Sequence, residues 1–144
     1  MTTVSQEFFE LLLHLFRRIV RREKGLKGYG TLTLPQVVIL DALQRNPRLK
    51  MRELSTLLGI GMSAATGLVD RMLKAGIVTR ARDLEDRRVV WVSITAKGRL
   101  LFRQFRQARQ QTFQVMFRGL SEREQATFLS LFRRTSQNLK ENPS

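Results

Sequence analysis

The sequence predicts a mainly α-helical domain with one small two-stranded β-hairpin. Apolar side chains recur at helical spacing along six segments, which is typical of amphipathic helices. Only two short runs, 77–79 and 89–94, are rich in β-branched residues and typical of strands. The stretch between these runs is too polar to pack in a core, as expected for the tip of a hairpin. With 144 residues, one domain is the default expectation.

The first predicted helix covers residues 4–24 and has two adjacent apolar stripes. A helix lying on a single surface needs only one stripe, so we expect this one to contact its own core and something else. The lone histidine, His14, lies in this apolar stretch, which favours a packed or interface role over a ligand. Basic residues fill the last turns, where cations complement the helix dipole: Arg17, Arg18, Arg21, Arg22 and Lys24. Gly25, Gly28 and Gly30 then predict a loop.

Three further helices are predicted in the middle of the chain. Thr33 and Gln36 have capping-box spacing at the start of the first, and Asn46-Pro47 ends it. A short helix follows from about residue 50 to 58, then the turn 59–61, then a helix from about 63 to 75 that Gly76 ends. The buried faces are predicted to comprise Val37, Val38, Leu40 and Leu43 in the first helix, and Ala64, Ala65, Leu68, Val69 and Met72 in the last.

The predicted hairpin tip, residues 80–88, has seven charged side chains in nine positions. Because a lone hairpin is only marginally stable in water, we expect this one to pack against the preceding helices. Trp91 lies in its second strand, where a packing role is expected rather than base stacking. Helix resumes at Thr95 and continues to about residue 118. Gly119 breaks it, and a capping box at Ser121 and Glu124 starts a last helix to about residue 139.

The charge balance indicates an anionic partner. The chain has 26 Lys and Arg against 12 Asp and Glu, a formal net charge of +14. Such an excess on a small chain favours polyanion binding, and arginine suits phosphates and guanine edges. One alternative is a surface that is merely basic. Another is an anionic membrane surface, which requires a helix with a basic face opposite an exposed apolar face.

The order helix, glycine turn, helix, charged hairpin is typical of a winged helix-turn-helix. In such units the second helix enters the major groove of DNA with its first residues at the base edges. Small residues from Ser63 to Thr66 at the start of the predicted 63–75 helix permit close approach. A basic hairpin tip after that helix can reach the DNA backbone or the minor groove, where arginine is favoured.

Residues 54–98 resemble the MarR family of transcriptional regulators. The matching text is LSTLLGIGMSAATGLVDRMLKAG (54–76), IVTR (77–80), DRR (86–88) and ITAKG (94–98), and LTLPQ (32–36) resembles the start of the family's second helix. The DRR tip and the Ile-Thr-x-x-Gly after it are fairly specific markers. The six-helix order and the length extend the resemblance over nearly the whole chain.

The resemblance implies a homodimer formed by the N- and C-terminal helices, bound to double-stranded DNA at a palindromic promoter site. It implies a repressor, and in many members a small aromatic or anionic effector that releases the DNA. It places Arg88 in the minor groove, Asp86 as the residue that orients it, and Arg87 on a phosphate nearby. Polar residues of the predicted 63–75 helix, which would be the recognition helix, and of the hairpin complete the predicted DNA-binding set. This set is Ser63, Thr66, Arg71, Arg82, Arg87 and Arg88.

Two glycines depart from the family pattern. Gly61 replaces the Ser or Thr that commonly caps the recognition helix, and Gly67 replaces a polar or basic side chain that often faces DNA. We therefore expect few direct contacts to base edges. Affinity for DNA should then depend on phosphate contacts and on the wing, which is the hairpin predicted at residues 77–94.

Several classes of function find no support in the sequence. There are no cysteines and one histidine, so disulfides, thiol redox switching and a zinc site are not expected. No phosphate-binding glycine loop, His-Glu-x-x-His motif or Ser/His/Asp set is evident, so we predict no enzyme activity, no cofactor and no bound metal. No apolar run is long enough to span a bilayer and no signal peptide is evident, which predicts a cytoplasmic protein without membrane contact.

The sequence thus predicts a single domain, 1–144, with a winged helix-turn-helix DNA-binding region at 32–95 and a helical dimerisation region at 1–31 and 96–144. The predicted function is sequence-specific transcriptional regulation, as a promoter-binding repressor relieved by an effector. A sequence-tolerant architectural DNA-binding protein is the first alternative, because the recognition helix has few long donors. A helical protein–protein adaptor that uses the wide apolar helices is the second.

Overall fold

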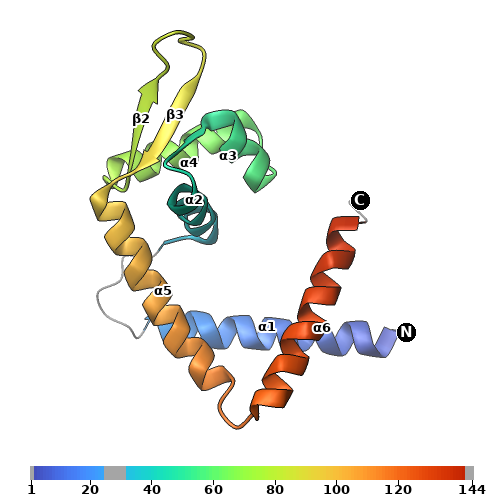
Figure 1. Ribbon diagram of the computed structural model, residues 1–144. Helices are drawn as coiled ribbons and strands as arrows, with labels where there is room; N and C mark the ends of the chain where they lie inside the picture. The colour runs from blue at the N-terminus through green and yellow to red at the C-terminus, as the bar shows by residue number, and fades with distance from the viewer. Residues whose placement is uncertain (1, 25–31, 142–144) are drawn as a thin grey trace. The chain divides into compact units, whose positions relative to one another are not determined.

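The computed structural model describes residues 2–24 and 32–141, and this part of the chain contains six helices and a three-stranded sheet (Figure 1). The elements are α1 (Thr2–Lys24), α2 (Leu34–Arg45), β1 (Arg48–Lys50), α3 (Met51–Leu58), α4 (Met62–Lys74), β2 (Val78–Arg82), β3 (Val90–Ile94), α5 (Ala96–Met116) and α6 (Glu122–Glu141). The mainly helical class and the number of helices are confirmed. The loop predicted around Gly25, Gly28 and Gly30 lies outside the described residues.

The chain forms two compact units, residues 1–108 and 109–144, whose boundary falls inside α5. The first unit contains α2, α3, α4 and the sheet. The second contains the end of α5 and all of α6.

The sheet has the order β1-β3-β2 with both pairings antiparallel. β2 and β3 are the predicted hairpin, in which Val78 pairs with Ile94 and Arg82 with Val90. The prediction of two strands was incomplete, because β1 adds a third on the free edge of β3, where Leu49 faces Val92. β1 has only one apolar residue between Arg48 and Lys50, so the sequence shows no strand periodicity there.

The core of the first unit lies between α2, α3, α4, the sheet and the start of α5. Its fully buried large side chains are Ile39, Leu40, Leu43, Leu54, Val69, Met72, Ile77 and Val92. The prediction that Ala64 points inward was wrong: Ala64 is exposed, and its neighbour Ala65 is buried instead. Val37 and Val38 are only half-buried, because Ile39 takes the central core position on α2.

Local capping explains where several helices begin and end. The backbone N–H of Thr33 donates to Gln36 Oε1 at 2.9 Å, and that of Ser121 donates to Glu124 Oε2 at 2.7 Å, so both predicted capping boxes are confirmed. The Ser121 backbone and hydroxyl donors lower the pKa of Glu124. Gly76 has φ of +71°, a left-handed conformation that ends the helix at little steric cost.

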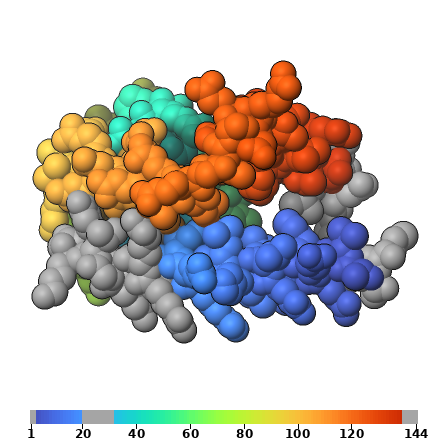
Figure 2. Space-filling model, turned by 90° about the horizontal axis from the view of Figure 1, so that it is seen from below, coloured from blue at the N-terminus to red at the C-terminus, as the bar shows by residue number. Residues whose placement is uncertain are grey.

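Helices α1 and α6 leave much apolar surface uncovered, each within its own unit. In Figure 2 the side chains of α1 (blue) form a continuous row, and Phe8, Leu11 and Phe16 are each more than 60% exposed. In the second unit the Phe128 ring packs edge-on against Phe117, with centroids 5.3 Å apart, and stacks on Phe132 at 6.1 Å. Phe128 and Phe132 remain about half exposed. Both helices therefore have apolar faces larger than their own units bury.

Candidate nucleic-acid interface

The helix-turn-helix consists of α3, a tight turn and α4. Gly59 adopts φ of +63° at the end of α3, and the Ser55 hydroxyl donates to the Ile60 carbonyl at 2.6 Å, which fixes the turn. Gly61 is the N-cap of α4 and has no side chain to satisfy the first amides of the helix. These amide groups are thus left for a solvent or ligand acceptor, as expected where a phosphate approaches.

The face of α4 opposite the core has few long side chains. Ala65, Leu68, Val69 and Met72 are buried, whereas Ser63 and Arg71 are exposed and Thr66 is half-buried. Asp70 is ion-paired with Arg80 of β2, with 2.8 Å between Oδ1 and Nη1. This pair connects α4, the predicted recognition helix, to the wing, which consists of β2, β3 and the tip between them.

Gly67 is an open position on this helix, because a Cβ added there would meet nothing closer than Arg71 Nη1 at 3.9 Å. Gly67→Ala is expected to stabilise the unbound protein by up to about 1 kcal/mol through helix propensity. If DNA approaches the helix closely here, the same methyl group weakens DNA binding. Thermal unfolding and DNA titration of one preparation measure both effects. A variant that is more stable and binds DNA as tightly as the parent would contradict close approach at Gly67.

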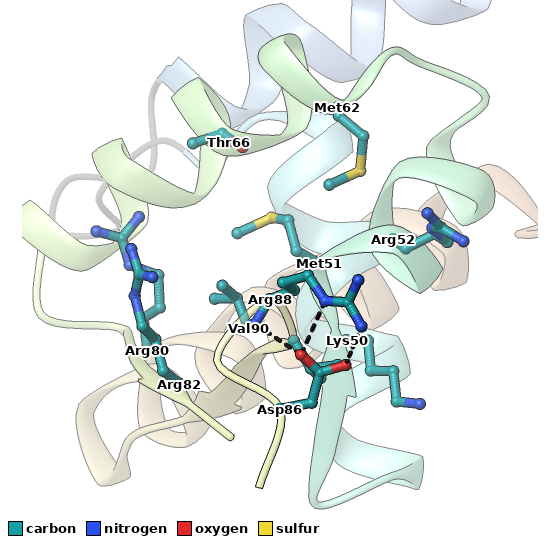
Figure 3. A pocket seen from close by; sticks show the side chains of 11 residues that line it. Lys50, Met51, Arg52, Met62, Thr66, Arg80, Arg82, Asp86, Arg88 and Val90 are labelled. Carbon is teal, nitrogen blue, oxygen red and sulfur yellow. Dashed lines mark hydrogen bonds and ion pairs between the residues drawn. The ribbon is translucent and has the colours of Figure 1, made fainter. Parts of the chain in front are cut away.

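A groove of about 710 Å³ lies between the start of α3, the start of α4 and the wing (Figure 3). Five cationic side chains and one carboxylate line it, with Thr66 and Met62 of α4 on the opposite wall. We call it the wing groove, and its lining is Lys50, Met51, Arg52, Met62, Thr66, Arg80, Arg82, Asp86, Arg88, Val89 and Val90. Such a concentration of positive charge attracts an anion such as a phosphate.

The structure brings some of the predicted site residues together here and leaves others apart. Thr66, Arg82, Asp86 and Arg88 line the wing groove. Ser63, Arg71 and Arg87 are exposed but do not line it. Lys50, Arg52, Met62 and Arg80 also line the groove and are not among the residues predicted from the sequence. The period-2 spacing of Arg80 and Arg82 in a strand was a signal that could have identified Arg80.

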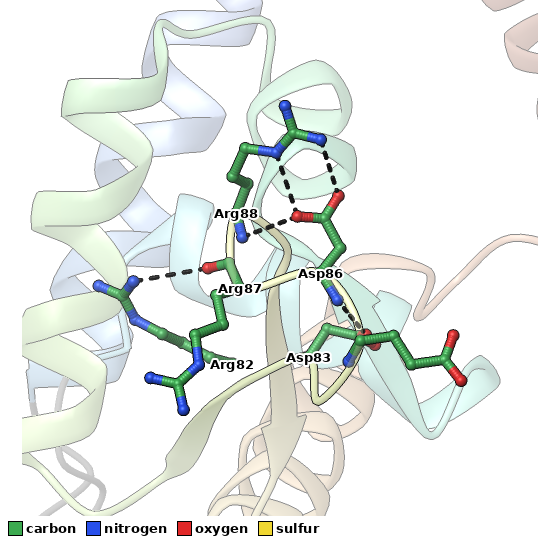
Figure 4. Close-up of polar contacts among 6 residues, drawn as sticks. Arg82, Asp83, Asp86, Arg87 and Arg88 are labelled. Atoms are coloured by element: carbon green, nitrogen blue, oxygen red, sulfur yellow. Dashed lines mark hydrogen bonds and ion pairs between the residues drawn. The ribbon is translucent and has the colours of Figure 1, made fainter.

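The wing tip is organised by two aspartates (Figure 4). Asp86 Oδ1 accepts from the backbone N–H and from Nε of Arg88, both at 3.1 Å, and Oδ2 accepts from Nη2 at 3.3 Å. Arg82 Nη1 is 3.5 Å from the Arg87 carbonyl oxygen, which it contacts weakly. The side chain of Arg88 nevertheless stays 92% exposed. The tip thus presents a guanidinium group whose direction Asp86 restricts.

The Arg88 guanidinium and backbone N–H lower the pKa of the Asp86 carboxyl. Asp86 therefore stays ionised at neutral pH. Because the pair is exposed, it contributes little to folding stability. Its effect is on the orientation of Arg88.

Asp83 connects the tip to the body of the sheet. Its Oδ2 accepts from Trp91 Nε1 at 2.8 Å, and its Oδ1 accepts from the backbone N–H groups of Glu85 and Asp86 at 3.0 and 3.1 Å. The Trp91 hydrogen bond, those two backbone donors and the charge of Arg48 lower the pKa of Asp83.

Tryptophan emission is expected to follow the titration of Asp83, since Trp91 is the only tryptophan. Because the pKa of Asp83 is lowered in the folded protein, the Trp91 hydrogen bond to the ionised carboxylate is fully present above the ordinary pKa of 3.8. The bond is lost only as the pH falls through the lower pKa of the folded state. Emission should therefore stay constant from about pH 7 to pH 4 and shift only below. In the Asp83→Asn variant the tryptophan emission should be shifted already at neutral pH. A parent emission that changes between about pH 7 and pH 5 would contradict this assignment.

Metal clusters and membrane-spanning helices are both absent from the described part of the chain. Over residues 2–24 and 32–141, no group of three or more His, Asp or Glu side chains is placed to hold a metal ion. Within the same ranges, no helix is both long enough and apolar enough to cross a membrane.

HTH-type transcriptional regulators and MarR family proteins are among the known proteins that this chain resembles. The MarR family model matches residues 32–90, which contain α2, β1, α3, α4, β2 and the hairpin tip that follows β2. The Bacillus subtilis HTH-type transcriptional regulator YsmB is 30% identical over 74% of this chain and 73% of its own length. YfiV of the same organism, also an HTH-type transcriptional regulator, is 36% identical, and this chain covers only 45% of its length.

Two solved structures have the same architecture. A MarR family protein from Bacillus stearothermophilus is 26% identical with a TM-score of 0.78, covering 97% of this chain and 98% of that one. Bordetella bronchiseptica BpsR, from a structure on the regulation of its DNA binding by 6-hydroxynicotinic acid, is 25% identical with a TM-score of 0.69. That comparison covers 90% of this chain and 98% of BpsR.

Proposed function

This chain belongs to the MarR family of transcriptional regulators, and from that premise we propose that it represses transcription as a homodimer bound to a palindromic promoter site. The observation that best supports DNA binding is the wing groove, where Thr66 of α4 and the wing arginines Arg82 and Arg88 line one cationic surface. A promoter-binding regulator acts where a bacterial chromosome lies, which is the cytoplasm. We assign it no catalytic activity.

In the proposed complex each recognition helix α4 enters a major groove with its N-terminal end at the base edges. Ser63 and Thr66 contact base edges, and the open N-terminus at Gly61 lets the backbone amides approach a phosphate. Arg88 enters the adjacent minor groove, where arginine is electrostatically favoured. Arg71, Arg82 and Arg87 contact phosphates. Two-fold symmetry places the two helices one DNA turn apart, about 34–36 Å.

The dimer is proposed to form through residues 1–31 and 96–144, on either side of the DNA-binding region 32–95. The exposed apolar side chains of α1 and α6 support this assignment, because large uncovered apolar faces mark interaction sites. A second copy of the chain offers the same faces, as a two-fold interface requires.

Release by a small-molecule effector is the remaining part of the proposal. The regulation of DNA binding by 6-hydroxynicotinic acid, as described for BpsR, supports an effector of this kind here. A ligand shifts the protein between DNA-competent and incompetent arrangements only if it binds them with different affinity. We assign no effector site.

A sequence-tolerant architectural DNA-binding protein is the alternative that a specific observation favours. Gly61, Ala64 and Gly67 leave much of the outer face of α4 without hydrogen-bond donors, while the wing groove is strongly cationic. Phosphate contacts alone give sequence-independent affinity. The two functions differ in how strongly affinity depends on base sequence.

Selection of bound sequences from random DNA tests the proposal. A dimeric regulator is expected to enrich an inverted repeat whose half-sites lie about one helical turn apart, with A·T-rich flanks where the wings insert. Enrichment without any consensus would contradict the regulator and favour the architectural protein. A monomer at micromolar concentration would contradict the dimer.

A further inference from the structure

Trp91 of β3 connects the sheet to the wing tip through one carboxylate. Its indole N–H donates to Asp83 Oδ2 at 2.8 Å, and Asp83 lies at the other end of the hairpin loop, eight residues earlier. The second oxygen of Asp83 accepts the backbone N–H groups of Glu85 and Asp86. Both carboxylate oxygens of Asp83 are therefore occupied, one by the sheet and one by the tip.

The connection continues to the arginine that we expect in the minor groove. The backbone of Asp86 is held by Asp83, and its side chain binds the backbone and the guanidinium of Arg88 (Figure 4). The backbone of the tip adds two bonds, Asp83 N–H to the Val89 carbonyl and Val89 N–H to the Asp86 carbonyl, both 2.9 Å. The direction of Arg88 thus depends on a series of contacts that starts at Trp91.

On its other side Trp91 is held by β1. The Arg48 guanidinium carbon lies 4.2 Å from the ring centroid and Lys50 Nζ lies 5.3 Å from it, within the range of cation–π interactions. β1 leads directly into α3, the first helix of the helix-turn-helix, and the Lys50 backbone N–H donates to Glu53 Oε2 at 2.6 Å there. Trp91 is therefore in contact with the strand that precedes the helix-turn-helix and with the wing tip.

Core packing does not explain this arrangement. Trp91 is half-exposed and belongs neither to the buried hydrophobic cluster nor to the partly buried hydrophobic residues packed against it. Its neighbours Val90 and Val92 on the opposite face of β3 make those contacts instead. What Trp91 contributes is a directed N–H donor and a ring face for cations.

We propose that Trp91, acting through Asp83, is a positioning residue that sets the direction of Arg88 for DNA binding. This inference rests on the proposed DNA-binding function and adds residues that never touch DNA themselves. Without the Trp91 bond the tip keeps its backbone bonds but loses its side-chain link to the sheet, so Arg88 samples more directions and binding costs more conformational entropy.

A double-mutant cycle of Trp91→Phe and Arg88→Ala tests the proposal, at low salt so that weak binding stays measurable. Phenylalanine keeps an aromatic face for Arg48, although a smaller one, and removes the N–H donor. Trp91→Phe is expected to weaken DNA binding in the parent by up to about tenfold, because a less restricted Arg88 side chain loses more conformational entropy on binding. In the Arg88→Ala background the same substitution should weaken DNA binding by less than about twofold. Equal losses in both backgrounds, or no loss in the parent, would overturn the proposal.

Asp83→Asn is the second variant, and it applies if Trp91→Phe folds poorly. The amide keeps an oxygen for the backbone donors of Glu85 and Asp86 but places an NH2 donor opposite the indole N–H, so only the Trp91 link breaks. We expect a similar tenfold loss of affinity, a shifted tryptophan emission and no further loss in the double variant with Trp91→Phe. Unchanged emission and affinity would overturn the link. A parent that binds no DNA would instead overturn the proposed function, and the two failures are distinguishable.

Discussion

Replacing Arg88 with alanine is expected to weaken binding to the selected DNA site by about 10- to 100-fold, or about 1–3 kcal/mol. The side chain of Arg88 is 92% exposed, and Asp86 holds its Nε and Nη2 atoms. A guanidinium group held in one direction loses less side-chain entropy when it enters a narrow minor groove. The loss should be largest for sites with A·T-rich flanks and small for a scrambled duplex. Fluorescence anisotropy with both duplexes at one salt concentration measures it.

Arg99→Ala is the matched control for this prediction. Arg99 is exposed on the first turn of α5, outside the wing, so the variant loses the same charge at a different place. It should bind within about twofold of the parent, because Arg99 does not line the wing groove and a charge that does not contact DNA is screened by salt. If Arg99→Ala and Arg88→Ala weaken binding equally, net charge and not wing geometry determines affinity.

Gly98→Ala is expected to destabilise the folded protein by about 2–3 kcal/mol, a fall in Tm of roughly 5–10 °C. A Cβ at residue 98 would overlap the Ile77 carbonyl oxygen and lie 2.9 Å from Ile94 Cγ1. The backbone cannot easily withdraw, because Gly98 N–H donates to Thr95 Oγ1 at 3.0 Å while the Thr95 hydroxyl donates to the Gly76 carbonyl at 2.7 Å. Thermal and denaturant unfolding measure the change.

Gly67→Ala is the internal control, since it makes the same substitution in another helix where the added methyl group meets only Arg71 Nη1, at an ordinary contact distance of 3.9 Å. The two variants should change stability in opposite directions. A Gly98→Ala protein within about 0.5 kcal/mol of the parent would show that the β3–α5 junction is less tightly packed than the structure indicates.

The elements that sequence alone predicted are those that local chemistry determines. Capping boxes at Thr33 and Ser121 depend on contacts three residues apart, and the left-handed Gly76 ends a helix by its own conformational freedom. β1 was missed because its existence depends on the edge of β3, more than 40 residues later in the chain. Ala64 was placed inward because a small apolar side chain differs little from its neighbour Ala65 in any pattern.

In the candidate site, too, the sequence predicts local contacts and misses those that form only in the folded protein. Asp86 and Arg88 are two residues apart, so their pairing follows from the local turn. Trp91 was interpreted as a packing residue, because its hydrogen bond to Asp83 exists only once the hairpin has closed. Met62 and Lys50 were missed because they join the wing groove from different elements.

The ratio of affinities for the selected site and for a scrambled duplex of equal length, measured at one salt concentration, tests the central claim most directly. A sequence-specific regulator is expected to prefer its site by at least about 10³-fold. A ratio near one, with both affinities falling steeply as salt rises, would contradict sequence-specific regulation and leave an architectural DNA-binding protein.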